Sequence, residues 1–170
     1  MIDLEDHKAH RYKLSFGVIT VSSTRTPDND ETGKLIRDII TREGFTVTYY
    51  TIVKDNISQI RYAFFTGIKN ADVLIFNGGT GISLYDLTPE ALVPYLKIIV
   101  GFGEAFRNLS YADVGSSAML SRAFAGVYGK NIIFALPGSP KACELALRKL
   151  IIPEVHHIYY EITKERSNQI

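Results

Sequence analysis

Two kinds of hydrophobic pattern alternate along the first half of the chain. Short runs of apolar, often β-branched residues predict three buried strands, at Leu14–Val21, Thr46–Val53 and Val73–Phe76. Between these strands, apolar residues three and four positions apart predict two helices. The first covers Thr32–Glu43 and is ended by Gly44, and the second follows Asp55 or Asn56, either of which can cap it.

The second half of the chain continues this alternation with shorter patterns. In chain order it predicts a helix begun by Thr88 as N-cap and Pro89, a short strand at Ile98–Val100, a helix at Gly103–Ser110, a hairpin of Phe124–Tyr128 and Ile132–Leu136, and a helix at Lys141–Ile151 that continues past Pro153. Strands alternating with helices predict an α/β sheet covered on both faces. Residues 1–13 read as a polar N-terminal arm, 14–165 as a single domain and 166–170 as a C-terminal tail.

Composition narrows the class of protein. The 170 residues include 19 basic and 18 acidic side chains, a balance that argues against a general nucleic-acid binder. The single cysteine excludes an internal disulfide and a Cys-rich zinc site, and it points to a reducing compartment. No apolar run approaches the roughly 18 residues of a membrane span, and the acidic start of the chain is unlike a signal peptide. We therefore expect a cytoplasmic protein with no membrane partner.

Four loops that follow predicted strands contain the candidate chemistry. Ligands of open α/β sheets bind at the carboxyl ends of the strands, so loops at these ends converge on one rim. The four loops cover residues 22–25, 54–56, 78–88 and 136–140, and all are rich in backbone donors, hydroxyl groups or carboxylates.

The loop Gly78-Gly79-Thr80-Gly81 is the most informative of the four. Three glycines permit positive φ angles and allow several N–H groups to face an anion without a β-carbon in the way. The spacing differs from the dinucleotide fingerprint, and the Gly-Lys-Ser/Thr end of a Walker loop is missing. A phosphate-binding loop and a simple tight turn are both compatible with this sequence.

Asp55 and Asp86 are the candidate acidic residues. Two carboxylates on one rim repel each other unless a cation lies between them, and Mg²⁺ bound by one or two carboxylates plus substrate phosphates is a common solution. Helix capping is an equally good explanation for Asp55. Asp86 is too far upstream of Pro89 for simple capping, which favours a function there.

The remaining reactive side chains give weaker signals. The four histidines, at positions 7, 10, 156 and 157, are near the termini and away from the predicted rim. Cys143 is best explained as a buried structural thiol, although it lies in the first turn of a predicted helix. Arg25 is either a phosphate contact or a surface ion pair. An anion site with carboxylates but no good base or nucleophile fits transfer between phosphates, which depends on positioning and charge neutralisation.

Taken in order, these motifs resemble the molybdenum cofactor biosynthesis proteins of the MoaB/MogA type, which are related to the N-terminal domain of gephyrin. The resemblance runs from about Leu14 to Glu154. Its markers are Val21-Ser22-Ser23-Thr24-Arg25-Thr26, Val53-Lys54-Asp55, Asn77-Gly78-Gly79-Thr80-Gly81, Asp86-Leu87-Thr88-Pro89-Glu90-Ala91, Gly101-Phe102-Gly103-Glu104, Leu120-Ser121-Arg122-Ala123 and Leu136-Pro137-Gly138-Ser139-Pro140.

The resemblance implies a three-layer α/β/α sandwich with a mostly parallel central sheet, assembled as a trimer or hexamer. It implies that molybdopterin is adenylylated with Mg²⁺ and ATP, giving adenylylated molybdopterin and pyrophosphate before metal insertion, with a metal-insertion protein as a further partner. Asp55 and Asp86 match the catalytic and metal-binding positions. The matching substrate-binding positions are Ser22, Thr24, Arg25, Gly78, Gly79, Thr80, Gly81, Glu104, Ser110, Pro137, Gly138 and Ser139.

Two residues depart from the family pattern. Ser23 stands where the family usually has Asp, and Tyr85 stands where it usually has Arg, so one possible bidentate phosphate contact is missing. The retained acidic residues favour an adenylyltransferase. The two departures favour the alternative, a catalytically silent molybdopterin-binding or scaffold protein of the same pathway. An unrelated nucleotide-binding module would share the fold but leave the ordered motifs unexplained.

Overall fold

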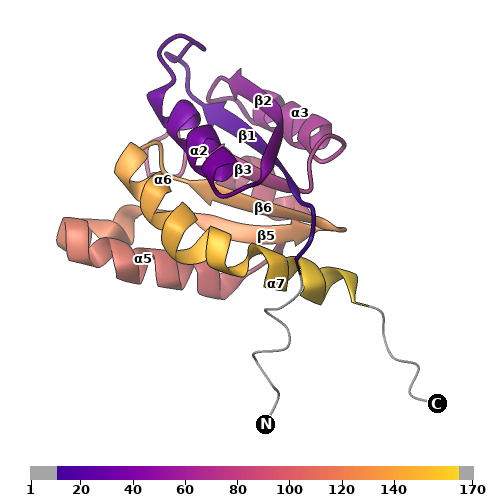
Figure 1. The fold of residues 1–170 in the computed structure, drawn as a ribbon. Helices are drawn as coiled ribbons and strands as arrows, with labels where there is room; N and C mark the ends of the chain where they lie inside the picture. Colours follow the sequence, from indigo (N-terminus) through magenta and orange to yellow (C-terminus); the bar gives the residue numbers. More distant parts are fainter. Residues whose placement is uncertain (1–10, 165–170) are drawn as a thin grey trace.

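A six-stranded sheet forms the centre of the molecule in this computed structural model, which describes residues 11–164 (Figure 1). The strand order is β2-β1-β3-β6-β5-β4. The first four strands in that order run parallel to one another, and β5 and β4 form an antiparallel edge. The strands are β1 (Ser15–Val21), β2 (Thr46–Val53), β3 (Val73–Asn77), β4 (Lys97–Ile98), β5 (Phe124–Tyr128) and β6 (Asn131–Leu136).

Helices cover both faces of the sheet, which confirms the predicted α/β sandwich with a mostly parallel sheet. Residues from α2, α5, α6 and α7 share a buried cluster with one face, and residues from α3 and α4 share a second cluster with the other. The helices are α2 (Glu31–Arg42), α3 (Ile57–Gly67), α4 (Thr88–Leu92), α5 (Val100–Val114), α6 (Pro140–Ala146) and α7 (Ile152–Thr163). Within residues 11–164, no helix has the length and apolar character needed to cross a membrane.

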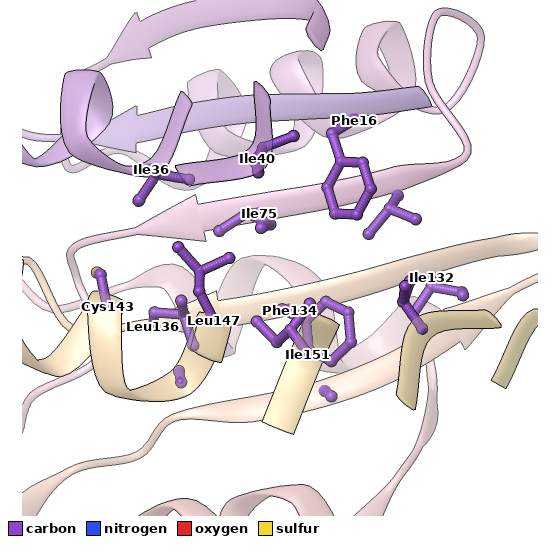
Figure 2. Packing of buried hydrophobic residues seen from close by; sticks show 14 of the residues in the cluster. Phe16, Ile36, Ile40, Ile75, Ile132, Phe134, Leu136, Cys143, Leu147 and Ile151 are labelled. Atoms are coloured by element: carbon purple, nitrogen blue, oxygen red, sulfur yellow. The ribbon is translucent and has the colours of Figure 1, made fainter. Parts of the chain in front are cut away.

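Successive side chains of the central strands belong alternately to the two buried clusters. On β3, Val73 and Ile75 belong to the first cluster, while Leu74 and Phe76 belong to the second, and all four are fully buried. Figure 2 shows the first cluster, where side chains of α2 and of the last helical stretch enclose Ile75 and Phe134. Strands buried on both faces are expected to be continuously apolar, as these are.

The predicted strands and the predicted hairpin are confirmed, and the differences concern helix ends. Val100 begins α5 instead of ending a strand, and α5 extends past Ser110 to Val114. The last helical stretch begins at Pro140 and passes through a π-helical turn, Leu147–Ile151, before α7. Residues 1–10, which include most of the predicted arm with His7 and His10, lie outside the described residues, as does the predicted tail.

The register of the parallel strands places their ends together. Thr20 on β1 is paired with Asn77 on β3, and Asn77 is paired in turn with Leu136 on β6. On the other side of β1, Val21 is paired with Val53 on β2. Because all four strands point the same way, the loops that follow them emerge at one rim, as the sequence predicts.

Replacing Phe134 with alanine tests the first core. Phe134 is 1% exposed, and its ring centre is 5.2 Å from that of Phe102. We expect the free energy of unfolding, measured with urea, to fall by about 3–5 kcal/mol, because a large cavity opens between the sheet and its helices. The control Tyr62→Ala removes a side chain that is 74% exposed, and it should change stability by less than about 0.5 kcal/mol. Equal losses in the two variants would contradict this assignment of the core.

Candidate functional site

Hydrogen bonds continue between the chain segments beyond the strand ends and hold the four loops together. The amide of Ser22 donates to the carbonyl of Val53 at 2.8 Å, and the amide of Gly78 donates to the carbonyl of Leu136 at 2.9 Å. The carbonyl of Gly138 accepts from the hydroxyl of Thr32 at 2.9 Å, which ties the last loop to α2. The rim is therefore a connected surface.

Glycine is required at two positions of the loop after β3, and a third glycine gives space to Asp86. Gly78 and Gly79 have φ angles of 104° and 69°, in the region that side chains rarely adopt. A β-carbon at Gly78 would also lie 2.3 Å from the carbonyl oxygen of Val21. At Gly81 a β-carbon would lie 2.6 Å from Oδ2 of Asp86, so a side chain there would require the Asp86 carboxylate to move. The glycines thus allow the loop to turn closely against β1 and allow Asp86 to approach it.

Thr88 anchors this loop to α4, and its predicted role as N-cap is wrong. The N-cap is Leu87, which makes no side-chain capping bond. The buried hydroxyl of Thr88 donates instead to the carbonyl of Gly78 at 2.8 Å, and its amide donates to the carbonyl of Gly79 at 3.0 Å. The glycine loop has carbonyl groups in need of donors, and this long-range use of the hydroxyl takes precedence over local capping.

Asp86 turns back towards the glycine loop. Its Oδ2 accepts from the amide of Ser83 at 2.9 Å, and the same oxygen faces Gly81. The carboxylate does not cap α4, so the capping explanation for this residue is excluded. Asp86 is partly exposed at the rim.

Asp55 is held by Ser23 from the neighbouring loop. Oδ2 of Asp55 accepts from the Ser23 amide at 3.0 Å and from the Ser23 hydroxyl at 2.7 Å. The cap of α3 is Asn56, whose side chain accepts from the amide of Gln59. Capping therefore does not explain Asp55 either. Ser23 therefore presents two neutral donors, its amide and its hydroxyl, to the Asp55 carboxylate.

A small pocket of about 160 Å³ opens beside the loop after β6. Three predicted residues line it, namely Ser110, Pro137 and Ser139. The Ser110 hydroxyl is buried and has no hydrogen-bond partner among the described residues. A buried hydroxyl in that state costs free energy, which makes it a candidate contact for a bound polar group. The other lining residues are Phe106, Asp113, Val114, Ser117, Ala118, Ser121, Lys141, Ala142 and Leu145.

Several pocket residues were missed by the sequence analysis because residues 111–122 have no clear periodicity. In the structure, residues 111–114 form the end of α5, and Gly115–Leu120 form a 3₁₀ segment. Lys141 and Asp113 form an ion pair at 3.3 Å beside the pocket. Glu104, which was predicted to bind substrate, is exposed on α5 and is not among the lining residues.

The predicted residues after β1 form a compact turn. The Ser22 hydroxyl accepts from the amides of Thr24 and Arg25. The Arg25 guanidinium donates to the carbonyl of Asn29 at 2.9 Å. Ser22 and Arg25 line a second hollow of about 500 Å³, together with Lys54 of the loop after β2. This hollow brings cationic side chains to the part of the rim that Asp55 occupies.

A buried polar network lies beneath the rim. The sequence did not predict it. Asp30 is 3% exposed, and its Oδ2 accepts from the hydroxyls of Thr20 and Tyr50, both at 2.6 Å. The Thr20 hydroxyl in turn accepts from the side-chain amide of Asn77 at 3.0 Å. Burial, followed by the hydrogen bond to Asp30, raises the pKa of Tyr50 to about 12. The network fixes the side chain of Asn77, the last residue before the glycine loop.

The thiol and the described histidines take no part in the rim chemistry. Cys143 is fully buried, and its Sγ donates to the carbonyl of Pro137 at 3.0 Å. Burial, with a smaller effect of the Asp30 charge, raises the pKa of this thiol to about 12. His156 accepts from the amide of Tyr12, and His157 pairs with Glu154, at the end of the sheet opposite the rim. Cys143 is the buried structural thiol that the sequence indicates.

Comparisons with known proteins agree with these motifs. A sequence model of a family described as a probable molybdopterin binding domain matches residues 17–157. Molybdenum cofactor biosynthesis protein B of Bacillus anthracis is 47% identical over 169 residues, covering 96% of this chain and 100% of that protein. The chain belongs to the MoaB/MogA family. Membership in this family assigns the chain to molybdenum cofactor biosynthesis.

Solved structures of the MoaB/MogA family have the same fold. A crystal structure of a molybdenum cofactor biosynthesis protein B superimposes with a TM-score of 0.87 at 44% identity, covering 91% of this chain and 98% of that one. The tungsten cofactor synthesizing protein MoaB from Pyrococcus furiosus superimposes with a TM-score of 0.83 at 36% identity, covering 91% of this chain and all of that one.

Alkaline unfolding tests the environment of Cys143. The folded pKa of about 12 lies above the ordinary thiol value of 9.0, so above pH 9 the unfolded chain loses a proton that the folded protein keeps. The contribution of Cys143 to stability is therefore constant below pH 9. It should fall by about 1.4 kcal/mol per pH unit between pH 9 and 12. The Cys143→Ala variant should lack this slope in urea titrations, and parallel pH curves for the two proteins would contradict the assignment.

Proposed function

We propose that this protein adenylylates molybdopterin, joining the pterin phosphate to the adenylyl group of ATP and releasing pyrophosphate. The observation that carries the proposal is the close approach of the Asp86 carboxylate to a glycine loop of positive φ angles. Such a loop binds phosphate oxygens through backbone amides, and a neighbouring carboxylate binds the cation that accompanies them. These are the two requirements of a nucleoside triphosphate site.

The pocket beside Ser110 suits the pterin. Its walls combine apolar surfaces of Phe106, Pro137 and Leu145 with the partnerless Ser110 hydroxyl. A flat heterocycle with polar edges needs apolar contacts on its faces and a few fixed hydrogen-bond partners. Lys141 lies beside the pocket, where its charge favours an anionic substituent on the ligand.

The donor set on the rim fits Mg²⁺. In both Asp55 and Asp86 the hydrogen bonds from amide groups fall on Oδ2. Mg²⁺ needs only one or two carboxylates when phosphates and water complete its octahedron. Within the part of the chain that the structure describes, no three His, Cys, Asp or Glu side chains gather into a metal-binding group, so in this proposal the phosphates supply the further ligands. When bound, Mg²⁺ would neutralise charge on the triphosphate.

The proposed reaction requires positioning and charge neutralisation from the protein. An oxygen of the pterin phosphate forms a bond to the α-phosphorus of ATP while the bond from that phosphorus to the bridging oxygen breaks. The attacking oxygen is already anionic near neutral pH, so a general base is not required. The glycine loop orients the phosphates, and the protein contributes mainly positioning and charge.

Ser23 and Tyr85 support the second candidate, a molybdopterin-binding or scaffold protein without turnover. Ser23 presents a hydroxyl to Asp55, and Tyr85, which directly precedes Asp86, is 78% exposed. Purified protein incubated with molybdopterin, Mg²⁺ and ATP distinguishes the two candidates. Formation of adenylylated molybdopterin above background establishes the enzyme, and binding without product establishes the scaffold.

The Asp86→Asn variant tests the proposed role of the Asp86 carboxylate. The amide keeps the size of the side chain but removes the charge that would hold the cation. We expect pyrophosphate release to fall by about two orders of magnitude or more, while molybdopterin binding, measured by fluorescence quenching, stays within about twofold of the wild type. The matched control Asp38→Asn changes an exposed carboxylate on α2 that pairs with Lys34, and it should leave both quantities unchanged. Wild-type turnover in Asp86→Asn would remove Asp86 from the mechanism.

We further propose that copies of this chain assemble into a trimer or hexamer. Leu84 is 92% exposed and Met119 is 77% exposed, and both lie on segments that are hydrogen-bonded to each other through Arg122. Exposed apolar side chains on neighbouring segments are typical of subunit contacts. Sedimentation equilibrium should give about three or six times the chain mass of 19.0 kDa, and the Leu84→Asp variant should shift towards smaller species. A wild-type monomer would contradict the assembly.

A further inference from the structure

The segment 115–122 lies between the Ser110 pocket and the loop of residues 78–88, which is called the phosphate loop below. On one side, Ser117, Ala118 and Ser121 line the pocket. On the other side, the next residue, Arg122, bonds to the loop that contains Gly81 and Asp86. One short stretch of chain therefore contacts both of the proposed substrate sites.

Arg122 contacts the phosphate loop at both of its ends. Its amide donates to the carbonyl of Thr80 at 2.8 Å, and its Nε donates to the carbonyl of Gly81 at 2.7 Å. Its Nη2 donates to the carbonyl of Asp86 at 2.8 Å, and its Nη1 forms an ion pair with Glu90 in α4. The guanidinium thus fixes the separation between the glycine motif and the acidic residue.

The chain around Arg122 is itself fixed to the pocket wall. The Arg107 guanidinium of α5 donates to the carbonyls of Ser121 and Ala123, at 3.2 and 3.0 Å. Arg107 lies between Phe106 and Ser110 in sequence, and both of these residues line the pocket. A continuous set of hydrogen bonds therefore runs from α5 through residues 121–123 to the loop with Asp86.

The hydrogen-bonding geometry requires arginine at this position. Two carbonyl oxygens and a carboxylate surround the side chain of Arg122, and only a planar guanidinium offers donors in several fixed directions at once. The hydrogen bond from Arg122 lowers the pKa of Glu90. A lysine would supply the charge without the forked geometry.

We propose that Arg122 is a positioning residue that couples the two substrate sites, so that filling the Ser110 pocket strengthens nucleotide binding at the glycine loop. This inference rests on the proposed function. A ligand in the pocket restricts the segment 117–121, and Arg122 transmits that restriction to the carbonyls of Gly81 and Asp86. By linkage, the nucleotide must strengthen pterin binding by the same factor.

Binding titrations of each ligand in the presence and absence of the other test this coupling. The probes are molybdopterin and the Mg²⁺ complex of α,β-methylene-ATP, in which the bond to be cleaved is inert. For the wild type we expect each ligand to increase the affinity of the other by about fivefold or more. In the Arg122→Gln variant this ratio should fall below about twofold, and Arg122→Lys should recover only part of it.

Arg61→Gln is the matched control. Arg61 also donates to backbone carbonyls of α4, those of Ala91 and Glu90, but it does so from α3 on the other core. The control should keep the wild-type coupling ratio. Should Arg122→Gln fail to fold by circular dichroism, Glu90→Gln keeps the arginine and its carbonyl bonds, and it should lower the ratio to an intermediate value.

The outcomes separate this inference from the proposed function. Binding of both ligands to the wild type without mutual enhancement overturns the coupling alone, as does a wild-type ratio in Arg122→Gln or a loss of the ratio in Arg61→Gln. Failure of the wild type to bind either ligand overturns the proposed function, and the coupling falls with it.

Discussion

The close contact between the glycine loop and the end of β1 is the constraint on which the rim depends. The carbonyl of Val21 occupies the space where a side chain at Gly78 would begin. The Thr88 hydroxyl occupies the corresponding space at Gly79, with 2.5 Å between it and the position of a β-carbon. The loop can therefore follow the sheet edge only with glycine at these two positions. The position of Asp86 follows from the same arrangement, because Gly81 gives its carboxylate room.

Sequence patterns predicted the sheet, both of its faces and the loops of the rim. They did so because strands buried on two faces are continuously apolar and because the parallel order brings their ends together. They also identified Asp55, Asp86 and the three glycines as residues of one rim. Helix ends were less predictable, since Thr88 has the residue type of an N-cap but forms a long-range bond to Gly78.

The parts that sequence reasoning missed depend on contacts between distant residues. Asp30 looks like a turn residue, and only the fold brings Thr20 and Tyr50 to its carboxylate. Residues 111–122 show no periodicity, yet they line the Ser110 pocket through a helix end and a 3₁₀ segment. Asp55 was assigned to two possible roles, and the structure decides against capping because Asn56 caps α3 and Ser23 holds Asp55.

The contacts of Arg122 with the phosphate loop have a consequence for how this loop can evolve. Three of its bonds end on backbone carbonyls, and a carbonyl is the same for every amino acid. The side chains of Ile82, Leu84 and Tyr85, all of them exposed, are therefore not needed to hold the loop in place. Mutations can accumulate at Ile82 and Tyr85 without loss of the loop conformation, whereas Leu84 is constrained by the proposed subunit contact. Tyr85 illustrates this freedom, because its side chain is 78% exposed while the loop is held through carbonyl groups on either side of it.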